Sequence, residues 1–283
     1  MNLKDIINQG TETISRLYPE REAREMVLSY LESRVGTSRH THIIEPGYQV
    51  PDEALPDITD AFNRMAAGEP LQYVTGKAYF YGREFNVTPD VLIPRPETEI
   101  MCREIIRNAP ESPRVLDLCT GSGCIAWTSA LEIPDADVTA VDISDGALGV
   151  ASGQDFSGEK CLISPEFIKA DVLGTPLKGL GEFDVIASNP PYVMDSEKAL
   201  MRKNVLDHEP HLALFVPDTD PLVFYRAVAV WALELLKKEG YGIVEINEAL
   251  GPQTAEIFSG AGFVSVRILK DLNDKDRFVE FKR

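Results

Sequence analysis

Cysteine is scarce in this sequence, and no two cysteines are spaced as C-x-x-C. The four present are Cys102, Cys119, Cys124 and Cys161. Zinc knuckles and disulfide scaffolds both need closely spaced cysteines, so we expect reduced thiols and neither kind of site. Long apolar runs are missing too, since no window approaches the roughly 18 uncharged apolar residues of a membrane span. The start, M-N-L-K-D-I-I-N, lacks the apolar segment of a signal peptide, which favours a cytoplasmic protein without membrane association.

Basic residues are also in short supply. The chain has 28 Lys and Arg against 45 Asp and Glu, a formal net charge of -17. Nonspecific affinity for nucleic acids comes mainly from Lys and Arg that displace counterions, so this balance argues against a stable nucleic-acid partner. A basic protein partner would be attracted instead, although acidity that only keeps the chain in solution explains the same numbers.

Apolar residues are plentiful enough for a core, at 44% of 283 residues. Two segments near the start carry them at helical spacing. The first stripe is Ala23, Met26, Val27, Tyr30 and Leu31, and the second is Ile58, Ala61, Phe62 and Met65. We interpret residues 1–72 as a small helical domain that is interrupted by a loop around Glu45, Pro46 and Gly47. We also place His40 and His42 in a loop and expect both to be exposed.

The pattern then changes twice. Residues 73–96 alternate and carry aromatic residues, with glycines at positions 76 and 82, which predicts a β-hairpin linker. In residues 97–283, short apolar strands alternate with helical stretches, which is typical of a parallel sheet covered on both faces. The last two strands, F-V-S-V-R-I and R-F-V-E-F-K, are close enough to form a hairpin. We therefore expect an α/β fold with a seven-stranded, doubly wound, Rossmann-like sheet that has an antiparallel edge hairpin.

A glycine loop follows the first of these strands, in V-L-D-L-C-T-G-S-G-C-I-A. Gly121 and Gly123 would let a ligand approach the backbone at a helix N-terminus. Asp142 ends the next strand, about 20 positions on, where it can hold the two hydroxyls of a ribose. Because Ala126 stands at the position of the third glycine, the loop also fits the degenerate fingerprint G-x-G-x-x-A of dinucleotide-binding sites.

Asp117 favours a different ligand. A carboxylate just before the glycines would repel a pyrophosphate, but it suits a cationic sulfonium or an α-amino group, and S-adenosylmethionine carries both. Asp171, after the third strand, adds an acceptor for an adenine amino group. The alternative is that each acid only caps the helix behind it.

The fourth strand runs into S-N-P-P-Y, residues 188–192. Neither proline can donate a backbone hydrogen bond, so the sheet ladder must stop at a stiff corner. The side-chain carbonyl of Asn189 and the backbone carbonyl of Pro190 could accept one N–H each from a planar NH2 group, which would point its remaining face at a methyl donor. Tyr192 offers a ring face for such a group to rest on. A simple chain reversal is the alternative.

Taken together, N-P-P-Y after D-x-x-x-G-x-G resembles the class I S-adenosylmethionine-dependent methyltransferases that act on planar nitrogen. Further stretches are similar to the HemK/PrmC family, which methylates the glutamine N5 in the Gly-Gly-Gln motif of peptide-chain release factors. They are G-E-P-L-Q-Y-V-T-G (68–76), F-Y-G-R-E-F-N-V (80–87), V-L-I-P-R-P-E-T-E (91–99) and E-P-H-L-A-L (209–214). The resemblance covers nearly the whole chain. It implies a cytoplasmic, monomeric enzyme of translation termination whose N-terminal domain binds class 1 release factors.

The resemblance also implies roles for particular residues. The contacts to S-adenosylmethionine, and to the product S-adenosylhomocysteine, would come from Asp117, Thr120, Gly121, Gly123, Asp142, Asp171, Val172 and Asn189. Catalysis would rest on Asn189, Pro190 and Tyr192, and the substrate would also meet Pro191, Arg95 and Glu209. Arg95, Pro96 and Thr98 would close over the site. The segment E-I-N after the fifth strand is less glycine-rich than the family pattern, which leaves Asn247 without a clear role.

Two other functions remain open from the residues alone. An adenine N6 methyltransferase of DNA or RNA would use the same proline corner, but the net charge argues against it. An NAD-dependent reductase would use the glycine loop, but Asp117 argues against that. His208 and His211 are spaced as H-x-x-H without a third ligand in view, so we expect no metal site.

Overall fold

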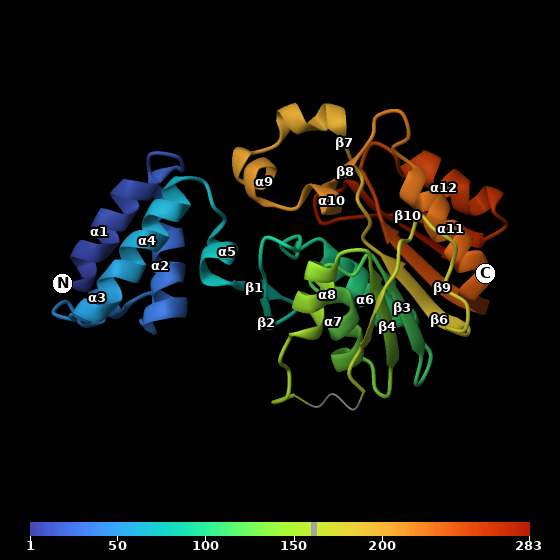
Figure 1. The fold of residues 1–283 in the computed structure, drawn as a ribbon, viewed down its shortest axis with the longest axis horizontal. Coiled ribbons are helices and arrows are strands. Elements are labelled where there is room, and N and C mark those ends of the chain that lie inside the picture. Colours follow the sequence, from blue (N-terminus) through green and yellow to red (C-terminus); the bar gives the residue numbers. More distant parts are fainter. Residues whose placement is uncertain (160–162) are drawn as a thin grey trace. The chain divides into compact units, whose positions relative to one another are not determined.

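The N-terminal helices form where the sequence stripes predict them. The computed structural model describes residues 1–159 and 163–283. In its first part the helices are α1 (Leu3–Ile14), α2 (Glu20–Val35), α3 (Thr41–Ile44), the 3-10 turn η1 (Asp52–Ala54), α4 (Leu55–Ala66) and α5 (Leu71–Thr75) (Figure 1). Their core contains nearly every residue of the two predicted stripes, with Met26 packed against its edge. That part of the interpretation is confirmed.

Helix α2 shows how the sequence sets its limits. It follows Pro19 and carries Glu20 and Glu22 in its first turn, where acidic side chains oppose the positive end of the helix dipole. It ends at Gly36, whose φ of 73° is the left-handed conformation that favours glycine.

His42 corrects one expectation in this region. It is half-buried in the short helix α3, not exposed in a loop. Its Nε2 lies 3.2 Å from Arg24 Nη2, and burial together with that guanidinium lowers the pKa of His42.

Two compact units make up the described chain. One contains residues 1–77 and 202–208, and the other contains residues 78–201 and 209–283. The first therefore includes α9 (Lys203–His208), which the sequence analysis did not assign to this domain. The functional division at residues 72 and 96 stays a prediction. No helix in the described ranges is both long and apolar enough to cross a membrane.

The strands β1 (Lys77–Phe80) and β2 (Arg83–Asn86) pair in a sheet of their own, and all of this hairpin except Lys77 belongs to the second unit. The helices that follow are α6 (Thr98–Asn108), α7 (Cys124–Glu132), α8 (Asp145–Ser152), α10 (His211–Leu214), α11 (Val223–Leu235) and α12 (Gly251–Gly260), with the 3-10 helix η2 (Asp195–Leu200). The main strands are β3 (Arg114–Leu118), β4 (Asp137–Asp142), β5 (Glu166–Lys169), β6 (Phe183–Ser188), β9 (Leu236–Glu245), β10 (Val264–Lys270) and β11 (Asp276–Lys282).

These seven strands form one sheet in the order β10-β11-β9-β6-β3-β4-β5. Strands β5, β4, β3, β6 and β9 run parallel, and β11 is antiparallel to both of its neighbours. The predicted seven-stranded doubly wound sheet with an antiparallel edge hairpin is confirmed. Two very short strands, β7 (Val193–Met194) and β8 (Phe215–Val216), pair separately and were not predicted.

Alternate residues of the strands bury themselves in two different cores. Val115, Val185 and Ile243 pack with α6 and α7 on one face of the sheet. Their chain neighbours Leu116 and Ile186 pack with α11 and α12 on the other face (Figure 1). Because both faces are covered, the strands read as continuous apolar runs, and the polar residues at their carboxyl ends stand out.

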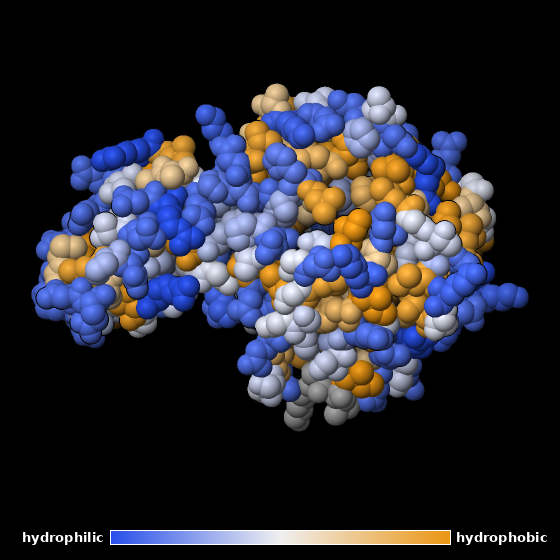
Figure 2. Space-filling model, viewed as in Figure 1, coloured by the Kyte–Doolittle hydropathy of each residue, from blue (hydrophilic) through white to orange (hydrophobic). Residues whose placement is uncertain are grey.

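The visible surface is mainly hydrophilic (Figure 2). Figure 2 shows polar side chains over much of the visible face, with apolar patches among them. Some large apolar side chains are strongly exposed, among them Leu200 at 88% and Leu272 at 90%.

Candidate active site

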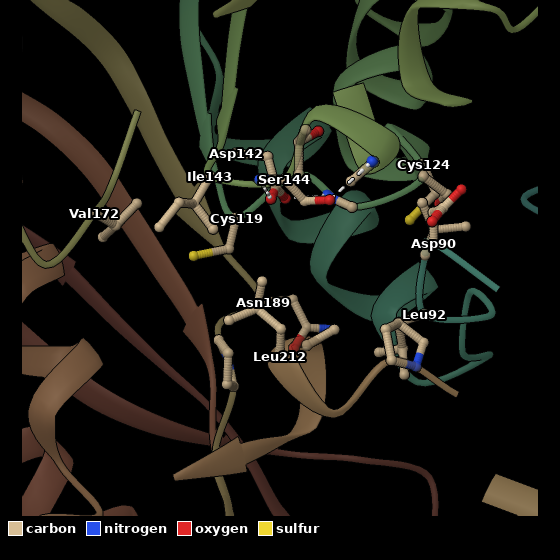
Figure 3. A pocket seen from close by; sticks show the side chains of 18 of the residues that line it. Asp90, Leu92, Cys119, Cys124, Asp142, Ile143, Ser144, Val172, Asn189 and Leu212 are labelled. Carbon is tan, nitrogen blue, oxygen red and sulfur yellow. Dashed lines mark hydrogen bonds between the residues drawn. The ribbon is translucent and has the colours of Figure 1, made fainter. Parts of the chain in front are cut away.

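A cavity of about 300 Å³ opens at the carboxyl ends of β3, β4 and β6, within the second unit. In doubly wound sheets this edge is where ligands bind. The polar and cysteine side chains of its lining are Asp90, Arg95, Thr98, Cys119, Thr120, Ser122, Cys124, Asp142, Ser144, Asp171 and Asn189. Figure 3 shows Asp142, Ser144, Cys119 and Asn189 around this space.

The glycine loop bends through three left-handed residues: φ is 63° at Cys119, 55° at Gly121 and 80° at Gly123. A Cβ added to Gly121 would meet no protein atom within 4 Å, so the backbone there faces open space. A Cβ added to Gly123 would lie 3.0 Å from the Cβ of Ala151 and 3.1 Å from Trp127. Gly121 therefore leaves room beside the cavity, whereas Gly123 allows α7 and α8 to pack closely.

Asp117 lies beneath this loop and is fully buried. Its Oδ2 accepts a hydrogen bond of 2.6 Å from Thr120 Oγ1, while its Oδ1 has no hydrogen-bond partner among the described residues. Burial, and less strongly Asp142, raises the pKa of Asp117 to about 7, although the Thr120 hydroxyl lowers it. A buried carboxylate oxygen without a donor would be satisfied by a cationic ligand.

Asp142 links the second strand to the glycine loop. Its Oδ2 accepts the backbone N–H of Gly121 at 2.9 Å, and its Oδ1 accepts that of Ser144 at 3.0 Å. Each oxygen keeps a further lone pair, and the carboxylate lines the cavity, as ribose binding requires. Asp171 also lines the cavity, and its Oδ1 holds the backbone N–H of Leu173 at 2.9 Å. Val172, beside it, is buried and contributes an apolar wall.

These features fit S-adenosylmethionine chemically. Gly121 leaves the backbone uncovered beside the cavity, and Asp142 offers paired acceptors at a neighbouring strand end. Asp117 has an unpaired carboxylate oxygen beneath the loop, but it is not among the described lining residues, so its contact with the cofactor stays a prediction. The described lining provides no cluster of basic side chains for a pyrophosphate, since Arg95 is its only Lys or Arg.

The corner S-N-P-P-Y begins at the end of β6. Ser188 is buried there and donates a hydrogen bond of 2.8 Å to the carbonyl of Leu118, which ties β6 to β3. Within the described chain, Asn189 and Pro191 line the cavity but Pro190 and Tyr192 do not. The predicted roles of the Pro190 carbonyl and the Tyr192 ring in holding a substrate stay predictions.

Tyr192 is instead held by two buried residues of the fifth parallel strand and its extension. Its hydroxyl donates to Glu245 Oε1 at 2.9 Å, and its backbone carbonyl accepts from Asn247 Nδ2 at 3.2 Å. Burial, with Glu245 nearby, raises the pKa of Tyr192 well above its usual value, so the phenol stays protonated. Asn247 also donates to Glu197 at 2.8 Å, so it fixes the corner.

Glu245 is the residue that sequence reasoning missed. Its side chain is buried at the end of β9, and its Oε2 accepts a hydrogen bond of 2.7 Å from Thr98. Burial raises the pKa of Glu245, and the hydrogen bonds from Thr98 and Tyr192 lower it. An acidic residue inside the apolar run G-I-V-E-I was the available signal, since a charge in a buried strand needs partners.

Arg95 and Glu209, both predicted to bind substrate, contact each other. Arg95 Nη2 lies 2.7 Å from Glu209 Oε1, and Glu209 Oε2 also accepts the backbone N–H of Ile93 at 3.3 Å. Arg95 lines the cavity, as Thr98 does, whereas Pro96 is not among the described lining residues. The pair joins the segment before α6 to the segment before α10. A direct contact of either residue with substrate stays a prediction.

The described residues contain no candidate metal site, and their cysteines are not paired. In residues 1–159 and 163–283, no group of three or more His, Cys, Asp or Glu side chains could hold a metal ion. Cys102, Cys119 and Cys124 are free thiols, and burial raises the pKa of each. Cys161 lies outside the described residues.

Comparisons with known proteins identify the family. The model described as "PrmC N-terminal domain" matches residues 5–76, and that described as "Methyltransferase small domain" matches residues 97–212. A release factor glutamine methyltransferase of Flavobacterium psychrophilum is 34% identical over 285 residues, 99% of each chain. This chain belongs to the family of release factor glutamine methyltransferases.

Other relatives agree. The release factor glutamine methyltransferase of Bacteroides thetaiotaomicron is 43% identical over 223 residues, 78% of each chain. A methyltransferase of Pyrococcus furiosus has a solved structure with a TM-score of 0.51 at 17% identity, covering 81% of this chain and 98% of that one. This last likeness shows the fold alone. The resemblance read from the motifs, and the methyltransferase fold it implied, are therefore confirmed, and the dinucleotide reductase is set aside.

Proposed function

We propose that this protein transfers a methyl group from S-adenosylmethionine to the N5 nitrogen of the glutamine in the Gly-Gly-Gln motif of class 1 release factors. The observation that carries the proposal is the position of Asn189, which lines the same cavity as Gly121, Asp142 and Asp171. The amide proposed to hold the glutamine and the residues proposed to hold the cofactor therefore line the same cavity. The names of the relatives support the choice of substrate.

The amide of glutamine is a poor nucleophile because its nitrogen lone pair is delocalised into the carbonyl. The enzyme must therefore orient that nitrogen. In the proposal Asn189 Oδ1 accepts one of its N–H groups and the Pro190 carbonyl accepts the other. Pro190 and Pro191 are both buried and stiffen the corner, so the two acceptors keep their spacing. Catalysis then rests on positioning, with no general base.

The remaining predicted residues would hold the cofactor. Asp117 would face its amino group, and Thr120 would keep that carboxylate oriented through the 2.6 Å hydrogen bond. Gly121 and Gly123 shape the loop, and Asp142 would accept from the ribose hydroxyls. Asp171 would accept from the adenine amino group, and Val172 would contribute an apolar wall. When bound, S-adenosylmethionine supplies a methyl group on a positively charged sulfur, and S-adenosylhomocysteine and one proton are released as the amide is methylated.

The wider setting is also part of the proposal. Residues 1–72 would bind the release factor, residues 73–96 would link them to residues 97–283, and the protein would act as a cytoplasmic monomer. The net charge of -17 supports a protein partner with basic surface over a stable nucleic-acid partner.

Methyl transfer from labelled S-adenosylmethionine to purified release factor tests the proposal. We expect label in the wild-type factor and none in a variant whose Gly-Gly-Gln glutamine is replaced by alanine. DNA and RNA serve as parallel acceptors. Label in adenine with none in the factor would replace this function with that of an adenine N6 methyltransferase.

A further inference from the structure

The side-chain amide of Asn189 is hydrogen-bonded to a buried residue. Asn189 Nδ2 lies 3.3 Å from Thr98 Oγ1, and Thr98 Oγ1 lies 2.7 Å from Glu245 Oε2. Thr98 and Glu245 are each 1% exposed. The three residues come from the end of β6, the start of α6 and the end of β9.

The direction of these hydrogen bonds follows from the number of hydrogens available. Glu245 accepts from Thr98 on one oxygen and from Tyr192 on the other, and these two donors counter the effect of burial and favour the carboxylate form. A carboxylate has no hydrogen to give. Thr98 has a single hydroxyl hydrogen, which it donates to Glu245. Its oxygen can therefore only accept from Asn189, which must turn its NH2 group toward Thr98 and away from the cavity.

The orientation matters because the two ends of an asparagine amide have nearly the same shape and opposite hydrogen-bonding properties. Asn189 Oδ1 accepts no hydrogen bond from any residue in the described ranges, so it remains available to an N–H group. With the amide turned over, an NH2 group would face the NH2 group of the substrate, and two donors would oppose each other.

We propose that Thr98 and Glu245 are positioning residues that fix the side-chain amide of Asn189 with its oxygen toward the substrate glutamine. This inference rests on the proposed function, since it names how the same site selects an NH2 group. In this arrangement Glu245 acts through Thr98, and Thr98 acts through Asn189, so both residues position the amide that holds the substrate. Tyr192 contributes by occupying the second oxygen of Glu245.

Thr98→Val and Thr98→Ser separate this role from a packing role. Valine keeps the shape of threonine but has no hydroxyl, whereas serine loses a methyl group and keeps the hydroxyl. We expect Thr98→Val to lower kcat for methylation of the release factor by about tenfold, the effect of losing one orienting hydrogen bond. KM for the factor and the affinity for S-adenosylhomocysteine should stay unchanged, and Thr98→Ser should recover most of the rate.

Thr254→Val is the matched control. Thr254 is also fully buried, on α12, and its hydroxyl has no partner among the described residues. The Thr254→Val variant should have an unchanged kcat. Glu245→Gln should lower kcat as Thr98→Val does, because the NH2 group of glutamine can donate to Thr98 and allow Asn189 to turn over.

A spectroscopic readout tests the orientation without any reaction. The side-chain NH2 signals of Asn189 in the ¹⁵N-labelled protein, assigned by their loss in Asn189→Ala, should shift in Thr98→Val and hold their position in Thr98→Ser and Thr254→Val. Unmoved signals in Thr98→Val, or a wild-type kcat in that variant, would overturn the inference. If the wild-type protein methylates no release factor, the proposed function fails, and the Asn189 signals still decide whether Thr98 holds the amide.

Discussion

Arg95 Nη2 lies 2.7 Å from Glu209 Oε1, and the Glu209 side chain is 1% exposed whereas that of Arg95 is 32% exposed. The pair thus joins a buried carboxylate to a guanidinium that still reaches water. Ile93 supplies the carboxylate with a second donor from the backbone. The contact holds the segment before α6, which contributes to the cavity wall, against the segment before α10.

Removing either partner should have unequal effects on stability. Arg95→Ala leaves a buried carboxylate without its cation, and we expect the free energy of unfolding to fall by about 3 kcal/mol. Glu209→Gln leaves a guanidinium that water can still solvate, and glutamine can keep the hydrogen bond from Ile93, so we expect a smaller loss. Denaturant unfolding of the two variants measures both values. Equal losses would mean that the burial of Glu209 does not control the effect.

Asn189→Ala should separate cofactor binding from turnover. The substitution removes the proposed acceptor for the glutamine N–H but none of the proposed cofactor contacts at the ends of β3 and β4. We expect kcat to fall by roughly a hundredfold or more, as when one preorganised hydrogen-bonding group is lost from an active site. Isothermal titration with S-adenosylhomocysteine should give a nearly unchanged affinity. Asn273→Ala, at an exposed position between β10 and β11, is the control. Persistent turnover in Asn189→Ala would mean that Asn189 does not grip the substrate.

The sequence predicted the sheet and the residues that follow its strands, for a simple physical reason. Strands covered on both faces are continuous apolar runs, so Asp117, Asp142, Asp171 and Asn189 stand out within or just after them. The carboxyl ends of parallel strands meet at one edge, which gathers these residues without any knowledge of their contacts. Figure 3 shows Asp142 and Asn189 gathered in this way.

The contacts between distant segments could not be predicted in the same way. Glu245 was visible as a charge in an apolar strand, but its partner Thr98 lies 147 positions away. Arg95 and Glu209 are 114 positions apart. The family resemblance implied that both contact the substrate, and nothing in the sequence indicated that they pair with each other. Asn247 was left without a role because E-I-N departs from the glycine-rich family pattern, and its hydrogen bonds to the Tyr192 carbonyl and to Glu197 form only in the tertiary structure.

Gly121→Ala tests whether the open space beside the loop is needed for the cofactor. The residue has φ of 55°, so alanine there should cost about 1 kcal/mol of stability through backbone strain. Since the new Cβ meets no protein atom within 4 Å, it would occupy cavity space, and we expect the affinity for S-adenosylhomocysteine to fall by about tenfold or more. Calorimetric titration and thermal unfolding measure the two effects.

Gly123→Ala is the companion variant. Its φ is 80°, and its new Cβ would press on Ala151 and Trp127, so it should lose more stability than Gly121→Ala. If Gly123→Ala unfolded at a higher temperature than Gly121→Ala, close packing of α7 against α8 would not be the reason for this glycine.

Ligand stabilisation distinguishes a nucleoside cradle from a dinucleotide site. S-adenosylhomocysteine at a hundred times its dissociation constant should stabilise the folded protein by about 2.7 kcal/mol. NAD should give no shift, because the described cavity lining offers a single basic side chain, Arg95, and Asp117 lies beneath the glycine loop. A melting-temperature series measures both. Stabilisation by NAD alone would contradict the cofactor assignment.

The raised pKa of Asp117 should make cofactor affinity depend on pH if this residue contacts the amino group of the cofactor, as proposed. Burial moves the pKa from 3.8 to about 7, so the free protein holds a proton on Asp117 over most of the range from pH 5 to 7. A cationic amino group beside Asp117 favours the ionised carboxylate, so binding releases that proton. Because a rise in pH favours proton release, the affinity for S-adenosylhomocysteine should increase from pH 5 to pH 7, by at most about tenfold per pH unit.

Asp117→Asn isolates this effect, because asparagine keeps the shape of the side chain and cannot ionise. Its affinity should be lower than that of the wild type at pH 7 and nearly independent of pH between 5 and 7, where the ligand's own amino group stays protonated. Stability should change with pH in the opposite direction to affinity. The folded protein holds this proton more tightly than the unfolded chain does. The free energy of unfolding of the ligand-free wild type should therefore decrease as pH rises from about 4 to 7. Titration calorimetry and denaturant unfolding at each pH measure the two slopes. An affinity slope that survives in Asp117→Asn would assign the proton to another group and remove Asp117 from the amino-group contact.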